Sequence, residues 1–348
     1  MTTHSPAEKT TARPSENLSP QTLLDMFWAM LISRRLDERS WALHRQGKIA
    51  FHISGMGHEG SQVAAAFAIN RGVDYVHSYY RDLALVLALG VTPHEFMISL
   101  FGKADEYSSG GRQMPSHWSK RSVNLLSSSS PVATQVPQAA GLAFAIKYKW
   151  DNKLVDPNDD TQPRLTLTCL GEGSTSQGEW HEGMNWAGVH NLPFICLVQN
   201  NMYAISEPTS EQMAVSNVAD RAPAYGLHGV VVDGNDILAS YDALKEAVER
   251  AYNGQGASLI EAKTYRVTPH SSDDDDRSYR SREEVEEWKH KDPIGRFQRF
   301  LTERGVLTQA KLDEFEARAR QTIDEAQRAA EAAPYPPEEY ALERVYAD

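Results

Sequence analysis

Two short polar motifs in this chain each follow an apolar run of the kind that forms a buried strand. A Gly-Glu-Gly turn at 171–173 comes directly after the apolar residues 165–170, and an asparagine pair at 200–201 follows residues 193–198. Residues 179–189 between them have a helical pattern, which predicts a strand-helix-strand crossover. Such a crossover makes the two strands parallel and brings Glu172 and Asn201 to one carboxyl edge of the sheet, where open α/β folds bind ligands.

Together these motifs offer oxygen ligands for a cation. The carboxylate of Glu172, the amide oxygen of Asn201 and a nearby main-chain carbonyl would suit magnesium, which keeps water and phosphate oxygens as its remaining ligands. The pattern therefore predicts a magnesium-bound diphosphate. The alternative is that the glycines form an ordinary turn, Glu172 caps the next helix and the asparagines form a second turn.

Along the rest of the chain, apolar strand-like runs alternate with helical patterns. We expect strands at 74–78, 165–170, 193–198, 229–232 and 258–265, and helices at 21–46, 61–69, 83–89, 138–148, 179–189, 237–252, 282–304 and 308–332. Residues 108–130 have little periodicity and are expected to form a long, ordered, functional loop. The pattern predicts one α/β domain over 21–332 with terminal helices, a disordered tail over 1–20 and a C-terminal tail over 333–348.

Composition excludes some classes of function. The chain has 348 residues, 41% of them hydrophobic, and a formal net charge of −12. The charge and the lack of a basic stripe argue against binding nucleic acid. No apolar run approaches the roughly 18 residues of a membrane span.

The first twenty residues show no secretion signal and few arginines, so we expect a cytoplasmic protein. Cys169 and Cys196 lie in strand-like runs and are expected to be buried free thiols.

A further glycine motif has the spacing of a dinucleotide fingerprint. Gly55, Gly57 and Gly60 fit G-x-G-x-x-G. However, a dinucleotide site needs a buried strand before the first glycine and an acidic residue at the end of the next strand, whereas polar residues precede Gly55 and Asp74 begins the next strand. We therefore expect a simple turn before a helix. The aspartates at 273–276 lack the alternating ligands of a calcium loop and are expected in a solvated or salt-bridged loop.

Several segments of the chain, within about residues 23–280, resemble the α chain of the decarboxylating, thiamine-diphosphate-dependent component of 2-oxo acid dehydrogenase complexes. The resemblance lies in five segments. They are the Tyr-Arg-Asp element at 80–82, the segment 129–135, the Gly-Glu-Gly turn at 171–173, the segment 199–206 around the asparagine pair, and the segment 265–280. It implies a three-layer α/β fold of the thiamine-diphosphate-binding type, with a parallel sheet and terminal helical extensions.

The resemblance also implies roles for individual residues. Thiamine diphosphate would be bound by Tyr80, Arg81, Ser130, Val132, Gly171, Glu172, Gly173, Asn201, Tyr203 and His270. Magnesium would be bound by Glu172, Asn201 and the main-chain carbonyl of Tyr203, and a monovalent cation such as potassium by Ser129, Thr134 and Gln135. His270 would be catalytic, in a loop organised by Ser271, Asp274, Tyr279 and Arg280. Glu172 replaces the commoner aspartate, and Gln199 stands where some members carry a phosphate-binding arginine.

The implied reaction is oxidative decarboxylation of a small 2-oxo acid, followed by acyl transfer to lipoyl-lysine on an acyltransferase partner. The family needs a glutamate that activates the cofactor, and the matching segments contain no candidate for it. The resemblance therefore implies an α2β2 heterotetramer in which a β chain supplies that residue. Segments 110–117 and 133–138 favour branched-chain 2-oxo acids. The alternatives are a pyruvate or acetoin dehydrogenase and, from another class, a non-catalytic structural partner chain.

Overall fold

A parallel five-stranded sheet forms the centre of the protein in the computed structural model, which describes residues 13–154 and 164–343. The strand order is β1 (Tyr75–His77), β2 (Thr166–Gly171), β3 (Phe194–Asn200), β7 (Ser258–Lys263) and β6 (His228–Asp233). Every neighbouring pair in this sheet is parallel. A separate antiparallel pair, β4 (Tyr203–Ala204) and β5 (Glu207–Pro208), lies beyond the end of β3.

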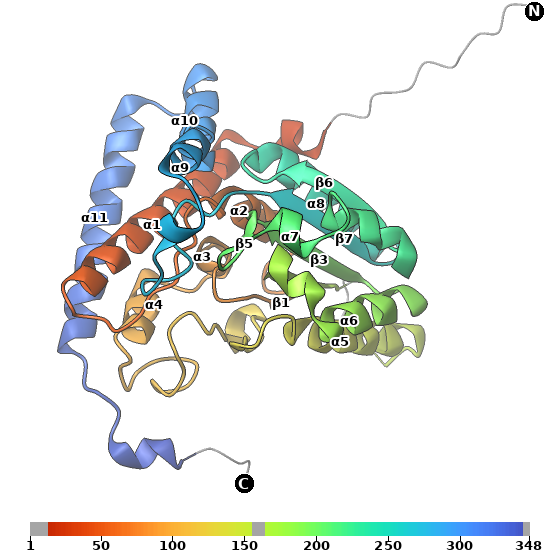
Figure 1. The fold of residues 1–348 in the computed structure, drawn as a ribbon, viewed down its shortest axis with the longest axis horizontal. Coiled ribbons are helices and arrows are strands. Elements are labelled where there is room, and N and C mark those ends of the chain that lie inside the picture. The colour runs from red at the N-terminus through yellow and green to blue at the C-terminus, as the bar shows by residue number, and fades with distance from the viewer. Residues whose placement is uncertain (1–12, 155–163, 344–348) are drawn as a thin grey trace, which may run out of the picture.

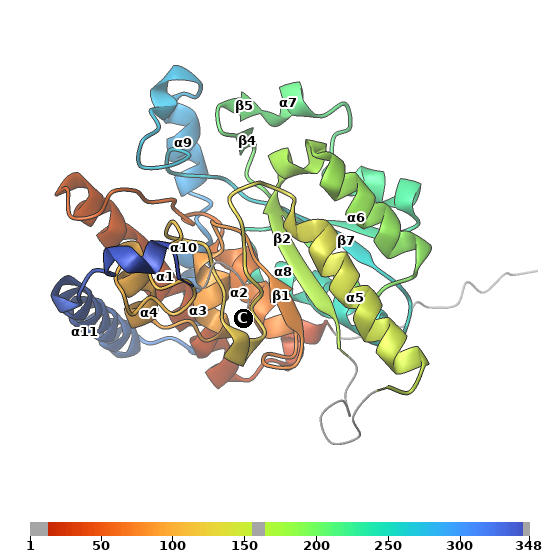
Figure 2. The same ribbon diagram turned by 90° about the horizontal axis from the view of Figure 1, so that it is seen from below.

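Helices cover both faces of the sheet and make a three-layer sandwich (Figure 1, Figure 2). One face shares a hydrophobic core with α5 (Gln135–Asp151) and α6 (Gly178–Val189), and the other shares a core with α2 (Glu59–Ala68) and α8 (Ile237–Tyr252). Alternate residues of β3 enter the two cores: Cys196 lies in the core under α5 and α6, and Leu197 lies in the opposite core. Because both faces are covered, β3 is buried along its whole length, as expected for a parallel sheet.

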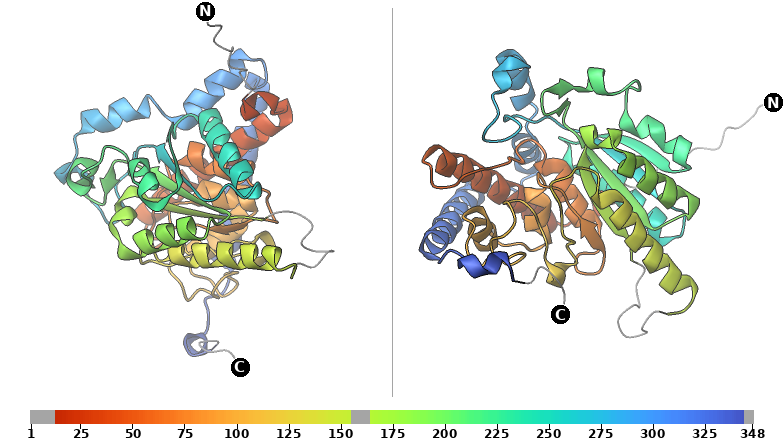
Figure 3. Two further views of the ribbon diagram at one scale, coloured as in Figure 1. Left: turned by 90° about the vertical axis from the view of Figure 1, so that its right-hand side faces the viewer. Right: turned by 60° about the horizontal axis from the view of Figure 1, so that its bottom comes forward.

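A group of helices from both ends of the chain stands beside the sheet. The N-terminal α1 (Pro20–Arg45) lies against the C-terminal α11 (Gln309–Ala332), as Figure 1 and Figure 3 show. Ion pairs join Arg35 to Glu316 and Arg39 to Asp324 across this contact. The other elements are α3 (Leu83–Leu89), α4 (Pro93–Leu100), α7 (Thr209–Gln212), α9 (Arg282–Lys289), α10 (Pro293–Glu303) and the 3-10 turns η2 (Arg121–Val123), η3 (Glu172–Ser176), η4 (Val218–Tyr225) and η5 (Asp276–Ser278).

Most predicted elements are present, and the differences have local causes. The single helix expected over 282–304 is two helices, because Asp292 caps a new helix whose first residue is Pro293. The prediction missed α4, although its sequence carries a capping box between Thr92 and Glu95. The strand expected over 258–265 ends at Lys263.

Ordered structure extends into both segments that were expected to be tails. Within the expected tail 1–20, η1 (Pro14–Asn17) is held on α8 by two hydrogen bonds from Ser15 to Asp242, of 2.6 and 2.8 Å. Residues 1–12 of that tail lie outside the described residues. Within the expected tail 333–348, η6 (Glu338–Ala341) follows α11, and Arg112 donates a hydrogen bond to the Tyr340 carbonyl. Local contacts that periodicity does not reveal therefore define both boundaries.

None of the helices in residues 13–154 and 164–343 is both long and apolar enough to cross a membrane. Cys169 and Cys196 are buried and unpaired, as predicted.

The register of the central strands explains how the two polar motifs meet. Gly171 at the end of β2 lies opposite Gln199 of β3, and Asn200 lies opposite Lys263 of β7. The chain therefore leaves three neighbouring strands at one edge. This arrangement confirms the strand-helix-strand crossover predicted from the spacing of Glu172 and Asn201.

Candidate functional site

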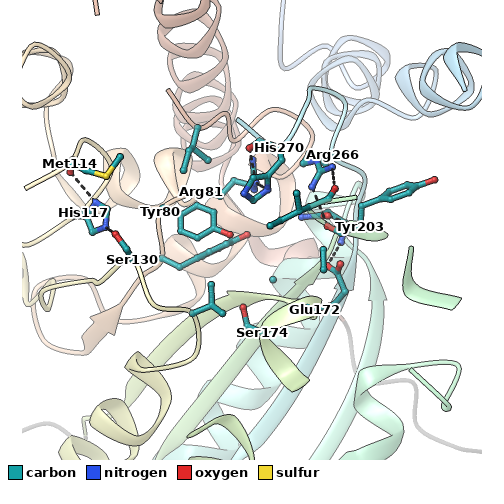
Figure 4. Close-up of a pocket in the computed structure, with 18 of the residues that line it drawn as sticks. Tyr80, Arg81, Met114, His117, Ser130, Glu172, Ser174, Tyr203, Arg266 and His270 are labelled. Carbon is teal, nitrogen blue, oxygen red and sulfur yellow. Dashed lines mark hydrogen bonds between the residues drawn. The ribbon is translucent and has the colours of Figure 1, made fainter. Parts of the chain in front are cut away.

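A cavity of about 410 Å³ lies at the carboxyl edge of the sheet (Figure 4). All ten residues predicted to bind the cofactor line it: Tyr80, Arg81, Ser130, Val132, Gly171, Glu172, Gly173, Asn201, Tyr203 and His270. They come from the β1–α3 turn, the long loop before α5, the ends of β2 and β3 and the loop after β7. The sequence motifs thus converge on one site.

The ends of β2 and β3 place two oxygen-bearing side chains, Glu172 and Asn201, in the lining of the cavity. Glu172 is 1% exposed, and its Oε2 accepts a hydrogen bond of 3.0 Å from the main-chain N–H of Asn201. Its other oxygen, Oε1, is buried and has no hydrogen-bond partner within the described part of the chain. Burial raises the pKa of this carboxyl group. A buried carboxylate oxygen without a donor is costly unless a cation or ligand meets it.

The third predicted metal ligand, the main-chain carbonyl of Tyr203, lies two residues beyond Asn201. It accepts a 3.2 Å hydrogen bond from Arg266, and the Tyr203 N–H donates to Asn201 Oδ1 at 3.3 Å. Each of these carbonyl oxygens has a second lone pair. The Glu172, Asn201 and Tyr203 oxygens are thus hard oxygens of the kind that magnesium prefers, and the metal site stays a prediction.

Glycines allow the chain to turn tightly beside these donors. A Cβ atom on Gly173 would lie 2.4 Å from the Cβ of Ala204, so the η3 turn can pack against β4 only with glycine at this position. Gly171 lines the cavity, and a Cβ atom there would have open space around it, with no described protein atom within 4 Å apart from those of its chain neighbours. The turn thus leaves space beside Glu172 for a ligand.

Two guanidinium groups give the cavity a positive character. Arg81 and Arg266 both line it and are 2% and 0% exposed. Among the described residues neither forms an ion pair, and the single carboxylate in the lining is that of Glu172. Burial and the charge of Arg81 lower the pKa of Arg266. Buried positive charge of this kind favours an anionic ligand, and a guanidinium can hold two phosphate oxygens at once.

His270 lies beside Arg81 on the opposite side of the cavity from the strand ends (Figure 4). An Arg81 N–H lies 3.4 Å from His270 Nδ1 and also donates to the His270 carbonyl at 3.3 Å. Burial, and then the charges of Arg81 and Arg266, lower the pKa of His270 to about 4. Because Arg81 can only donate, Nδ1 is the acceptor and the proton of the neutral ring is on Nε2.

The loop that carries His270 is held by its own polar side chains. Asp274 accepts hydrogen bonds from the His270 N–H at 2.7 Å and from the Tyr279 hydroxyl at 2.5 Å. Arg280 donates to the Thr268 carbonyl at 2.7 Å and pairs with Asp276. Asp274, Tyr279 and Arg280 thus make the loop contacts that the resemblance implies.

Ser271 is 7% exposed and accepts a hydrogen bond from the Asp273 N–H within the same loop. Its hydroxyl therefore supports the loop in this conformation and has little contact with solvent.

Sequence reasoning missed His117, which also lines the cavity. Its Nε2 lies 2.6 Å from Ser130 Oγ, and its Nδ1 lies 2.9 Å from the Met114 carbonyl. Since a carbonyl only accepts, the Nδ1 proton points to Met114 and Nε2 accepts from Ser130. The sequence feature that could have revealed it is a histidine at the end of the polar segment 110–117, which the resemblance relates only to substrate choice.

Other residues singled out in the sequence lie away from the cavity lining. Gln199 is fully buried and its amide donates to Asp82 at 2.6 Å, so it does not act as a substitute for a phosphate-binding arginine. Gln135 donates to the Cys169 carbonyl, and Ser129 donates to the Pro131 carbonyl. Thr134 is the residue before α5. The monovalent cation at Ser129, Thr134 and Gln135 stays a prediction.

Comparison with known proteins points to one group. The family model described as dehydrogenase E1 component matches residues 28–339. The chain is 48% identical over 334 residues to the 2-oxoisovalerate dehydrogenase subunit alpha of Bacillus subtilis, covering 95% of this chain and 97% of that protein. It is 39% identical to the mitochondrial 2-oxoisovalerate dehydrogenase subunit alpha of Caenorhabditis elegans, covering 88% of this chain and 68% of the relative. It is 37% identical to a Staphylococcus aureus pyruvate dehydrogenase E1 component subunit alpha, covering 89% of this chain and 78% of that protein.

Proposed function

Because the chain belongs to the dehydrogenase E1 component family, as a thiamine-diphosphate-dependent 2-oxo acid dehydrogenase α subunit, we propose that it acts on branched-chain 2-oxo acids. The single observation that carries the function is the convergence of all ten predicted cofactor residues around one cavity. The name of the B. subtilis relative supports the substrate class. A pyruvate dehydrogenase is the second candidate, supported by the less similar S. aureus protein.

The chemistry of the cavity fits a magnesium-bound diphosphate. Glu172 Oε1 has no hydrogen-bond donor among the described residues, and Asn201 and Tyr203, whose oxygens are the other proposed metal ligands, line the same cavity. Arg81 and Arg266 supply buried positive charge that no carboxylate pairs with in the described residues. We assign the metal to Glu172, Asn201 and Tyr203. We assign the phosphate oxygens to the side of the cavity near Arg81.

The residues of this chain have distinct tasks in the proposed mechanism. When bound, thiamine diphosphate supplies the nucleophilic carbon and the electron sink for decarboxylation. Glu172 and Asn201 would hold the metal and Arg81 would bind the phosphate group, while Arg81 also contacts the ring and the carbonyl of His270. His270, with its proton on Nε2, could move a proton to or from the reacting group in the cavity. The lipoyl disulfide of the partner would be the oxidant: as its S–S bond breaks, one sulfur would take the acyl group and the other would take the electron pair and a proton.

The lining supports a need for a second chain. Activation of the cofactor requires a carboxylic acid near its aminopyrimidine ring, whereas the single acid in the described lining, Glu172, is assigned to the metal. We propose that a β subunit supplies this acid in an α2β2 heterotetramer, and that a lipoyl acyltransferase accepts the acyl group. We also place the assembly in the cytoplasm, where two buried free thiols such as Cys169 and Cys196 are ordinary.

The deciding experiment compares substrates on the co-expressed α2β2 enzyme. We expect kcat/KM for 2-oxoisovalerate and 2-oxoisocaproate to exceed that for pyruvate, because an apolar pocket distinguishes each methylene by about 1–3 kcal/mol. Phe51, Ile53 and Met114 are among the apolar residues that this chain contributes to the lining. A preference for pyruvate would favour the second candidate. An assembled enzyme that decarboxylates no 2-oxo acid would instead support a non-catalytic structural role.

A further inference from the structure

A buried histidine lies directly behind the proposed metal ligand Asn201. His58 is 0% exposed, and its Nε2 lies 3.1 Å from the Nδ2 atom of Asn201. The other ring nitrogen, Nδ1, lies 3.3 Å from the Met56 carbonyl oxygen. His58 does not line the cavity and has no part in the function proposed above. Its contact is with the amide whose orientation decides whether Asn201 can bind a cation.

The two contacts of the ring determine which nitrogen carries the proton. The Met56 carbonyl can only accept, so the hydrogen of the neutral ring is on Nδ1 and Nε2 has a free lone pair. That lone pair accepts from the NH2 group of Asn201. The Asn201 oxygen, which already accepts from the Tyr203 N–H at 3.3 Å, then presents its second lone pair to the cavity. An amide turned the other way would present its NH2 group, which repels a cation.

The glycine motif that has the dinucleotide spacing holds His58 in this place. Gly57 has a φ of +92°, and a Cβ there would lie 2.1 Å from the Tyr265 carbonyl oxygen. A Cβ on Gly55 would lie 2.8 Å from the Arg81 carbonyl oxygen. The turn therefore packs tightly against two loops of the site, and only glycine permits that approach. The close packing of Gly55 and Gly57 thus places the His58 imidazole in contact with the Asn201 side chain.

We infer that His58 is a positioning residue that fixes the Asn201 amide with its oxygen toward the divalent cation. The inference rests on the proposed function, because it requires a metal at Glu172 and Asn201. Residues that hydrogen-bond to a metal-ligating side chain orient its ligand atom, and their loss typically weakens metal binding by about 10–100-fold. Without His58 the buried NH2 group loses its acceptor, and only the 3.3 Å contact with the Tyr203 N–H still favours one amide orientation over the other.

The test measures Mg²⁺ affinity by calorimetric titration of the metal-free α2β2 enzyme in saturating thiamine diphosphate. We expect His58→Phe, which keeps an aromatic ring but removes the acceptor, to raise the Mg²⁺ Kd about tenfold or more. His58→Ala serves the same purpose if the phenylalanine variant does not assemble. A Kd within about twofold of wild type in an assembled variant would overturn the inference.

A double-mutant comparison separates orientation from simple packing. Asn201→Asp places oxygen at both positions of the side chain, so no orientation has to be chosen, and the neutral His58 ring can carry its proton on Nε2 to donate to the carboxylate. In that background, we expect His58→Phe to change the Mg²⁺ Kd by less than about twofold. A tenfold loss in both backgrounds would mean that His58 acts through packing alone and would overturn the inference.

His77→Phe provides a matched control at a buried histidine outside the cavity lining. His77 is also buried, at 3% exposure, and its Nε2 lies 2.9 Å from Gln138 Oε1. This variant should bind Mg²⁺ as wild type does, and an equal loss there would overturn a specific role for His58. Wild-type enzyme that shows no saturable Mg²⁺ binding with thiamine diphosphate would overturn the proposed function itself. Wild-type binding with unchanged affinity in His58→Phe overturns only the role of His58.

Discussion

The two sides of the cavity are built in different ways. Glu172 and Asn201 stand at the ends of β2 and β3, where the paired register of the sheet places them, and both are buried. Arg81, Ser130 and His270 are carried by loops. We call the first set the strand-end side and the second the loop side.

The loop side is held by a few polar contacts and not by a ladder of main-chain hydrogen bonds. His270 is positioned by Asp274 through a 2.7 Å hydrogen bond and by Arg81 through contacts of 3.3 and 3.4 Å. Ser130 contacts His117 from a second loop. We propose that the two sides have separate roles, in which the strand-end side would bind the metal of the cofactor and the loop side would supply the reacting groups.

The largest expected effect is on the strand-end side. Glu172→Ala removes a metal oxygen that no other residue replaces, so the Kd for thiamine diphosphate with Mg²⁺ should rise more than about 100-fold in the α2β2 enzyme. Calorimetry measures the affinity. The metal-free enzyme should keep its Tm, because a buried carboxylate with a raised pKa contributes little stability. Glu303→Ala, at an exposed position in α10, is the control. Unchanged affinity in Glu172→Ala would show that the metal is not bound at the strand ends.

A different outcome is expected on the loop side. His270→Ala should lower acyl transfer to the lipoyl domain about 100-fold, the usual range for loss of a general acid-base group. The Kd for thiamine diphosphate should change by less than about threefold, because the strand-end ligands remain. Single-turnover acylation of the lipoyl domain, compared with calorimetry, separates the two quantities. Equal losses in both would contradict the division between the two sides.

The two sides also differ in how far the sequence predicts them. The positions of Glu172 and Asn201 follow from strand periodicity and from the parallel crossover, so spacing alone brings them together. No periodicity relates Ser130 to His117, or Arg81 to His270, because loop geometry depends on tertiary contacts. Only the family resemblance identified His270 and Ser130, and the neighbouring His117 was missed. In the same way, the contact of His58 with Asn201 depends on where a glycine turn packs, which no local pattern encodes.

A smaller effect concerns pH. The pKa of His270 is about 4 in the folded protein, mainly through burial and then through Arg81 and Arg266, whereas a free histidine titrates near 6.5. Between these values the unfolded chain binds a proton that the folded chain does not, so this group makes the metal-free enzyme less stable as pH falls from about 6.5 to about 4.

The His270→Gln enzyme should lack this contribution. The Tm of wild type should therefore fall more steeply than that of the variant as the pH is lowered through this range. Thiamine diphosphate should reduce the difference, because its negative charge offsets the two arginines and raises the pKa of His270. Parallel Tm curves without the cofactor would show that His270 is not held neutral by its surroundings.

The smallest effect is expected from Tyr203, which begins β4 just beyond the strand-end side and contributes only its main chain to the proposed metal site. The proposed metal ligand of Tyr203 is its carbonyl oxygen, whereas its hydroxyl group points away and donates to Glu284 at 3.0 Å. Tyr203→Phe should therefore leave the Mg²⁺ Kd within about twofold of wild type and cost about 1 kcal/mol of stability at most, because the Tyr265 hydroxyl still donates to Glu284 at 2.8 Å. Calorimetric Kd and Tm values check both parts. A tenfold loss of Mg²⁺ affinity would mean that the aromatic side chain, and not the main chain, determines the metal geometry, which would weaken the contrast between the two sides.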